Sequence, residues 1–201
     1  MPYQSTPPSP PLSPRLTATV IGLDRAIYRV AARWVGLVNL LVLGLLASII
    51  GAPLLRAGGQ EGIASVIYAI NRPFCHQRAD RSFRLLGEKM ACCERCFAIY
   101  VGILLFGVFF LITRSLRPLP WPGFVVLSLP ILIDALSQGP GWRESTPFLR
   151  VTTGLIFAIA LSWLLYPHLE RGFRDMRTTL EFKFARLAAE GRAAPLSRRS
   201  V

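Results

Sequence analysis

The sequence predicts an all-α integral membrane protein, a bundle of four transmembrane helices with an extramembrane Cys/His loop and amphipathic terminal helices. Its 201 residues are 52% hydrophobic and their mean hydropathy is +0.45, which is too hydrophobic for an ordinary soluble domain. The apolar residues also gather into long runs instead of amphipathic periods. Because helices in hydrocarbon satisfy their own backbone groups, these runs favour a helical bundle.

The N-terminal part of the chain divides into two segments. Residues 1–16 are rich in proline and serine and have no hydrophobic period, so we expect a disordered tail. Residues 17–33 place apolar side chains at helical spacing and set Arg25, Arg29 and Arg33 on another face. This pattern predicts a basic amphipathic helix on an anionic lipid surface. The alternative is a cytoplasmic extension of the first span.

Residues 34–169 form the predicted four-span membrane domain. The first apolar run has no charge between Arg33 and Arg56, and about 20 apolar residues suffice to cross a core of roughly 30 Å. A signal peptide is disfavoured because this run begins too far into the chain and is too long. The predicted spans cover about residues 34–55, 95–113, 121–138 and 150–167.

The C-terminal tail, residues 170–201, is basic and amphipathic. Apolar side chains recur there at steps of three and four residues with Arg and Lys between them. We expect an interfacial helix, with a solvated helix that docks on another protein as the alternative.

The charge distribution predicts the orientation in the cell membrane. With four spans and both termini cytoplasmic, 14 of the 23 Lys and Arg residues lie inside, and the Cys/His loop is external. The net charge of +12 reflects arginines that flank apolar runs, and no nucleic-acid-binding motif accompanies it. The predicted partners are therefore the lipid bilayer and, for the basic termini, an anionic lipid surface, with no nucleic acid.

The loop over residues 56–96 holds the candidate metal site. It contains all four cysteines of the chain and one of the two histidines. The C-x-x-C spacing of Cys93 and Cys96 allows two thiolates to share a metal or to form a disulfide. Together with Cys75 and His76 they form a Cys₃His set for one zinc or other transition metal. Adjacent residues usually point apart, so Cys92 is the substitute ligand if Cys75 and His76 cannot both bind.

The same loop supports two other interpretations. In a thiol–disulfide oxidoreductase, the start of the second span and Arg95 would favour a thiolate at Cys96. This layout is similar in outline to the quinone-linked membrane enzymes that make or reduce disulfides. In a purely structural role, a zinc or a disulfide pins the loop onto the bundle. The sequence does not decide whether the protein is an enzyme.

Polar residues outside the cysteines converge on the same face. Four spans place the first and third loops on one side, where Asp134 and Gln138 are one turn apart. Ionisable groups inside a span are costly, so Asp134 needs a partner or marks the path of a small transporter. Arg95, Arg143 and Arg150 are its candidate partners, and the further candidate site residues are Gln77, Arg81, Ser82, Tyr100 and Ser145.

These residues carry a family resemblance. Cys-His-Gln-x-x-x-Arg-Ser-Phe followed by Cys-x-Arg-Cys-x-x-Ile-Tyr-x-Gly resembles the signature of a bacterial membrane-protein family known as domain of unknown function 2085. The resemblance covers roughly residues 63–165 and includes Asp134, Gln138 and the stretch 141–146. Phe97-Ala98 and Pro147 depart from the expected pattern of Thr-Gly and Asn. The resemblance implies a class and candidate residues, and no activity.

Overall fold

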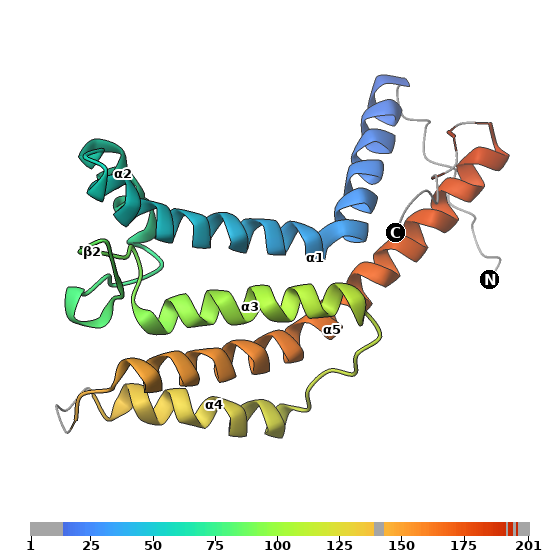
Figure 1. Ribbon diagram of the computed structural model, residues 1–201. Helices are drawn as coiled ribbons and strands as arrows, with labels where there is room; N and C mark the ends of the chain where they lie inside the picture. The colour runs from blue at the N-terminus through green and yellow to red at the C-terminus, as the bar shows by residue number, and fades with distance from the viewer. Residues whose placement is uncertain (1–13, 139–142, 192, 195, 197–201) are drawn as a thin grey trace, which may run out of the picture. The chain divides into compact units, whose positions relative to one another are not determined.

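The computed structural model describes residues 14–138, 143–191, 193, 194 and 196 of the chain (Figure 1). The described part is almost entirely helical, which confirms the all-α class. The predicted tail over residues 1–16 lies almost entirely outside the described residues. The elements in order are α1 (Pro14–Ala57), α2 (Glu61–Asn71), a 3₁₀ turn (Ala79–Arg81), β1 (Arg84–Leu85), β2 (Glu88–Lys89), α3 (Glu94–Ile112), α4 (Trp121–Leu136) and α5 (Pro147–Ala189).

Three of the described helices, α1, α3 and α5, are long and apolar enough to cross a membrane. α4 is apolar but has only 16 residues, so it is about 24 Å long at ~1.5 Å per residue. That is shorter than the roughly 30 Å of a hydrocarbon core. A fourth span therefore stays a prediction.

The two longest helices each join a predicted span to a predicted amphipathic segment. α1 has 44 residues and runs without interruption through residues 17–33 and the first span. α5 has 43 residues and continues from the last span into the basic tail. The boundaries expected from composition are thus not helix boundaries.

The chain divides into two compact units. The terminal unit comprises Met1–Arg33 and Gly172–Val201, and the central unit comprises Trp34–Arg171. Inside the terminal unit, Tyr28 donates a hydrogen bond of 2.8 Å to Glu181, and the guanidinium of Arg25 lies 5.5 Å from the ring centre of Phe184. Phe184 is fully buried. The C-terminal amphipathic segment therefore packs on the N-terminal one through the apolar side chain of Phe184, whereas Leu23 and Val30 of the N-terminal segment stay exposed.

Small residues bring the helices of the central unit together. A Cβ atom added at Gly154 in α5 would lie 2.8 Å from the backbone oxygen of Arg95 in α3. One added at Gly102 in α3 would lie 2.6 Å from the Cβ of Ala158 in α5. Such contacts are typical of membrane helices, which gain packing energy by close backbone approach.

The segment between α1 and α3 has more regular structure than the loop expected from the sequence. It contains α2 and a short antiparallel hairpin in which Arg84 pairs with Lys89. Leu86 and Gly87 at the hairpin tip have φ of 52° and 85°, as a two-residue turn with two left-handed positions requires. This segment leads the chain to the start of α3.

α5 begins at the position where the sequence departs from the family pattern. Thr146 precedes the helix, and its hydroxyl accepts a hydrogen bond of 3.3 Å from the backbone N–H of Leu149. Pro147 is the first helical residue, where its missing N–H costs nothing. Pro147 therefore suits the start of the helix.

Candidate metal centre

The four cysteines meet at the start of α3. Cys75 lies in the segment after α2, Cys92 and Cys93 follow β2, and Cys96 belongs to the first turn of α3. All four are free thiols, and all except Cys96 are buried. Cys93 is the residue before α3, with an extended backbone. A segment distant in sequence thus contributes one thiol to the three that surround the helix start.

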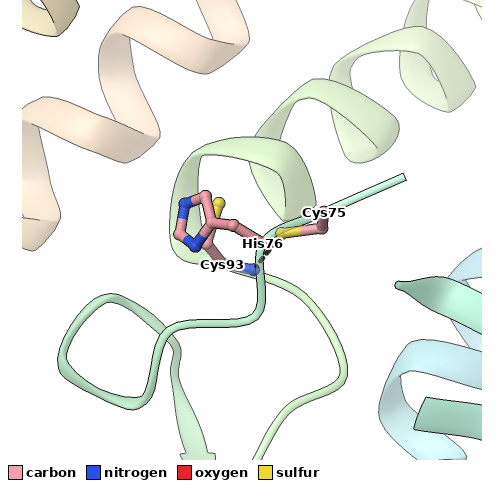
Figure 2. A group of neighbouring side chains, drawn as sticks. All are labelled: Cys75, His76 and Cys93. Carbon is pink, nitrogen blue, oxygen red and sulfur yellow. Dashed lines mark hydrogen bonds between the residues drawn. The ribbon is translucent and has the colours of Figure 1, made fainter. Parts of the chain in front are cut away.

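Cys75 belongs to two groups of potential ligands. The ligand atoms of Cys75, His76 and Cys93 lie within 4.8 Å of one another (Figure 2). Those of Cys75, Cys92 and Cys96 form a second group with the same limit. The backbone N–H of Cys93 also donates a hydrogen bond of 3.0 Å to the Sγ of Cys75. The four ligands expected from the sequence are therefore divided between two groups that share Cys75, and Cys92 joins the second.

A left-handed residue shapes the backbone beside Cys75. Gln77 has a φ of 52°, which is unusual for a residue with a side chain. Its side-chain amide donates a hydrogen bond of 2.8 Å to the carbonyl of Tyr68, and its own carbonyl accepts one of 3.0 Å from Lys89 Nζ. These two bonds hold the turn that places both Cys75 and His76 close to Cys93. Gln77 thus has a positioning role in this structure.

The surroundings of the thiols are apolar on one side and open on the other. Ile49 from α1 and Met90 from the end of the hairpin are buried with Cys75, Cys92 and Cys93, and Tyr100 packs against this cluster. His76 is exposed, and its Nδ1 accepts a hydrogen bond of 3.1 Å from the backbone N–H of Arg78. Water therefore reaches the cluster from the side of His76.

Mutual hydrogen bonding sets the charge of the thiols. Hydrogen bonding with Cys92, followed by that with Cys93 and Cys96, lowers the pKa of Cys75 well below its usual value. The same contact with Cys75 raises the pKa of Cys92. Hydrogen bonding with Cys75 raises the pKa of Cys93, but contacts with Cys92 and Cys96 outweigh it and lower that pKa to about 6. The metal-free cluster therefore holds thiolate at neutral pH, the form that binds metals.

The two residues between Cys93 and Cys96 are anchored to other helices. Glu94 accepts a hydrogen bond of 3.1 Å from Arg150 in α5, and both side chains are only 8% exposed. Arg95 forms an ion pair with Asp134 in α4. The C-x-x-C motif therefore also joins α3 to α4 and α5.

Asp134 is almost fully buried and has several donors. Arg143 Nη2 lies 2.7 Å from one carboxylate oxygen, and Ser145 donates a hydrogen bond of 3.0 Å to the other, which also receives Arg95. Gln138 donates a hydrogen bond of 2.6 Å to the backbone carbonyl of Asp134. The predicted convergence of these polar side chains is thus present.

Two of the candidate site residues pair with groups other than Asp134. Arg150, a candidate partner of Asp134, pairs with Glu94 instead. Arg81, another candidate site residue, lies 3.6 Å from the carboxylate of Asp80, its neighbour in sequence. Trp142, which belongs to the family-like stretch, lies outside the described residues.

Sequence reasoning did not single out Glu94 or assign contacts to Gly154. An acidic residue inside a C-x-x-C at the start of a span is itself a signal, because it needs a cation once buried. Arg150 at the start of another apolar run supplies that cation. No comparable signal exists for the contact of Gly154 with Arg95, since it depends on how α3 and α5 pack.

Comparison with known proteins places this arrangement in a family. The model of a family described as predicted membrane protein (DUF2085) matches residues 75–164. An uncharacterised protein of Methanocaldococcus jannaschii is 33% identical over 108 residues, which are 52% of this chain and 69% of that relative. The chain belongs to the DUF2085 family. An uncharacterised protein of Methanothermobacter thermautotrophicus is 34% identical over 94 residues, 46% of this chain and 85% of the relative. No solved structure matches the chain.

Membership in DUF2085 confirms the resemblance and the assignment to a membrane-protein class. Both relatives are archaeal, so the family is not restricted to bacteria. The family match begins at Cys75 and extends into α5. It therefore includes the cysteines, the ion pairs of Glu94 and Asp134, and the close contact at Gly154.

Proposed function

We propose that this DUF2085 protein is a multi-pass membrane protein that binds one transition metal, such as zinc, through its cysteine cluster. One observation carries the proposal: the Sγ atom of Cys75 lies within 4.8 Å of the Sγ atoms of Cys92 and Cys93, which precede α3, and of Cys96 in its first turn. Zinc–sulfur bonds of about 2.3 Å in a tetrahedral site place thiolates roughly 3.8 Å apart. Small side-chain rotations are enough to reach that spacing.

The proposed ligands are Cys75, Cys93 and Cys96, with Cys92 in the fourth position. Cys92 is favoured over His76 because it is 2% exposed and belongs to the same group as Cys75 and Cys96. Structural zinc sites are closed in this way, with four protein ligands. His76 in the fourth position, as the sequence alone predicts, is the alternative ligand set.

The proposed metal has a structural or sensory role. It would fasten the α2–hairpin segment to the start of α3, where Glu94 and Arg95 already connect to α5 and α4. Binding or loss of the metal would then change the packing at this end of the bundle. This accounts for a cysteine site that lies next to a buried ion network.

We further propose that α4 is a fourth span and that both chain ends are cytoplasmic. α3 and α5 both begin at the cysteine site, so the chain must return there between them, and α4 is the helix that brings it back (Figure 1). The pairing of the two ends in one terminal unit agrees with an even number of crossings. The Cys/His site would then be external. Reporter fusions at the hairpin tip and after α5 test this topology, and activity on the same side would refute it.

Metal analysis tests the main proposal. The full chain is purified without a His tag under anaerobic conditions, and its metal content and free thiols are counted. We expect about one metal per chain, its loss in Cys75→Ser, and its retention in His76→Ala and in the control His168→Ala. A metal-free protein with four reactive thiols contradicts the proposal. Loss of the metal in His76→Ala selects the Cys₃His set. The absorption spectrum of the cobalt(II)-substituted wild type independently distinguishes four sulfur ligands from three.

A second candidate function is thiol–disulfide exchange. It is favoured by the approach of Cys75 to both cysteines of the C-x-x-C, because two free thiols at this distance can form a disulfide. The two thiols would pass two electrons and two protons to a disulfide of a substrate protein. A mixed disulfide trapped in Cys96→Ser or Cys93→Ser supports this function, and its absence under oxidising conditions speaks against it.

Transport through Asp134 is less favoured. Arg95, Arg143 and Ser145 already satisfy its carboxylate, so its burial has a structural explanation. Flux in vesicles that is lost in Asp134→Asn while the fold stays intact would restore this alternative.

A further inference from the structure

A polar pocket lies beside the cysteine cluster; His76 and Gln77 contribute to its wall, but none of the four cysteines does. Its volume is about 360 Å³, and its walls come from the end of α1, one face of α2, the turn after Cys75, and β2. Three cationic side chains line it, and no carboxylate does. They are Arg56, Arg72 and Lys89.

The face of α2 opposite to this pocket is apolar. Ser65, Tyr68 and Arg72 follow one another at steps of three and four residues and form the wall of the pocket. Ile63, Val66 and Ile70, on the other face, are 55%, 59% and 61% exposed. A helix of this kind lies in a membrane interface with its apolar face toward lipid. The pocket then opens toward water.

The ring of Tyr68 organises two of the three cations. Lys89 Nζ and the guanidinium of Arg56 each lie 5.8 Å from its centre, a favourable cation–π distance. Glu88 lies 3.7 Å from Arg56, but both side chains are more than one-third exposed, so this pair is weak. The positive charge of the three side chains is therefore only weakly neutralised by neighbouring groups and can attract an anionic ligand.

Arg72 is the least engaged of the three. Among the described residues, its guanidinium has no ion pair and no hydrogen bond, although it stands at the end of α2 beside the pocket. Three cations around one cavity repel one another, and an anion between them removes that cost. Guanidinium groups bind carboxylates and phosphates through two parallel hydrogen bonds.

We propose that this pocket binds a small phosphate-bearing anion, held by Arg72, Arg56 and Lys89. A phosphate dianion offsets two of the three positive charges, and the volume lies at the lower end of small-ligand pockets, roughly 300–1,000 Å³. The phosphate comes either from a soluble molecule or from a lipid headgroup, and the position of the pocket opposite the apolar face of α2 favours the soluble source. This inference does not depend on the metal proposal.

Calorimetric titration with inorganic phosphate tests the site in the full chain. The protein is placed in nanodiscs of zwitterionic lipid, and Arg72→Gln and Lys89→Met are compared with wild type. We expect at least a tenfold weaker apparent affinity in each variant, because each loses a charged donor to phosphate. Arg78→Gln is the matched control, since Arg78 belongs to the same segment, pairs with Asp80 and does not line the pocket. An unchanged number of reactive thiols in all variants shows that the fold near the cysteines is intact.

Native mass spectrometry with added phosphatidylglycerol identifies the source of the phosphate. Saturable phosphate binding that depends on Arg72 supports a soluble ligand. Retention of the lipid by wild type and its loss in Arg72→Gln, without binding of inorganic phosphate, supports the same site with a headgroup as its ligand. The proposal is overturned if neither probe binds, or if Arg78→Gln weakens binding as much as Arg72→Gln.

Discussion

Arg150 lies 3.1 Å from Glu94, and this buried pair joins the first turn of α5 to the interior of the C-x-x-C motif. Arg95, the next residue, connects the same motif to Asp134 in α4. The spacing that presents Cys93 and Cys96 thus also presents two charges to neighbouring helices. Changes in the ion pairs should therefore affect the thiols, and changes at the thiols should affect helix packing.

Replacement of Arg150 by alanine should destabilise the protein strongly. It leaves Glu94 buried without its cation, and loss of one partner of a buried pair costs about 3–5 kcal/mol. The free energy of unfolding in mild detergent measures the effect. The control is Arg186→Ala, which removes an exposed pair with Glu190 and should cost about 0.5 kcal/mol or less. Equal stability of the two variants would show that the buried pair is unimportant.

A double variant separates charge from packing at the same site. Glu94→Gln combined with Arg150→Met removes both charges and keeps similar volumes. We expect it to be more stable than Arg150→Ala, because no unpaired charge remains. A double variant as unstable as the single one would mean that side-chain packing, and not charge, explains the loss.

Asp134→Asn should also destabilise the fold, by about 2–4 kcal/mol, because Arg95 and Arg143 lose their shared anion. Ser145→Ala should cost less, about 1 kcal/mol, since it removes one hydrogen bond and leaves both ion pairs. Chemical unfolding of the two variants measures this order. A larger loss of stability in Ser145→Ala than in Asp134→Asn would show that the hydroxyl of Ser145, and not the ion pairs, contributes most to stability at this site.

The sequence was enough to predict that the polar side chains gather at one end of the helices, but not which of them form ion pairs with each other. Long apolar runs gave the helical class, and the parity of the spans brought Asp134 and Ser145 to the cysteines. Which cation pairs with Asp134 depends on helix rotation, and a hydropathy run carries no information on rotation. Arg150 was therefore one of three equal candidates, and its actual partner, Glu94, was overlooked.

Spacing alone left open whether Cys75 and His76 can both approach Cys93, because successive residues usually point apart. In the structure the ligand atoms of Cys75, His76 and Cys93 lie within 4.8 Å of one another. The residue that follows them, Gln77, has a left-handed backbone, and a glutamine gives no warning of it. Likewise, α2 and the hairpin are too short and too polar to stand out within residues 56–96.

Gly154→Ala tests the close contact between α5 and α3. Its new Cβ would meet the backbone oxygen of Arg95 at 2.8 Å, and a backbone atom cannot rotate away. We expect a loss of about 1–3 kcal/mol in the free energy of unfolding. Gly172→Ala in the same helix is the control, because nothing lies within 4 Å of its Cβ position. It should be neutral or stabilising, by up to ~1 kcal/mol. Two equally destabilised variants would contradict the contact.

Removal of the metal should lower the stability of the whole central unit. A ligand present at 1,000 times its Kd stabilises the folded state by about 4 kcal/mol, so a chelator should lower the melting temperature of the wild type by several degrees. Cys75→Ser is the control, since it binds no metal in the proposed site and its melting temperature should not respond to the chelator. An equal response in this variant would show that the chelator acts elsewhere.

Acidification should release the same metal. Protons compete with the metal for thiolates, and the pKa of Cys93 in the metal-free protein is lowered to about 6, so this ligand stays available at neutral pH. We therefore expect constant metal content above about pH 7 and a loss as the pH falls through 6 and below. Elemental analysis after dialysis at each pH measures the profile. A metal content that does not fall at any pH at which the protein stays folded would contradict thiolate ligands.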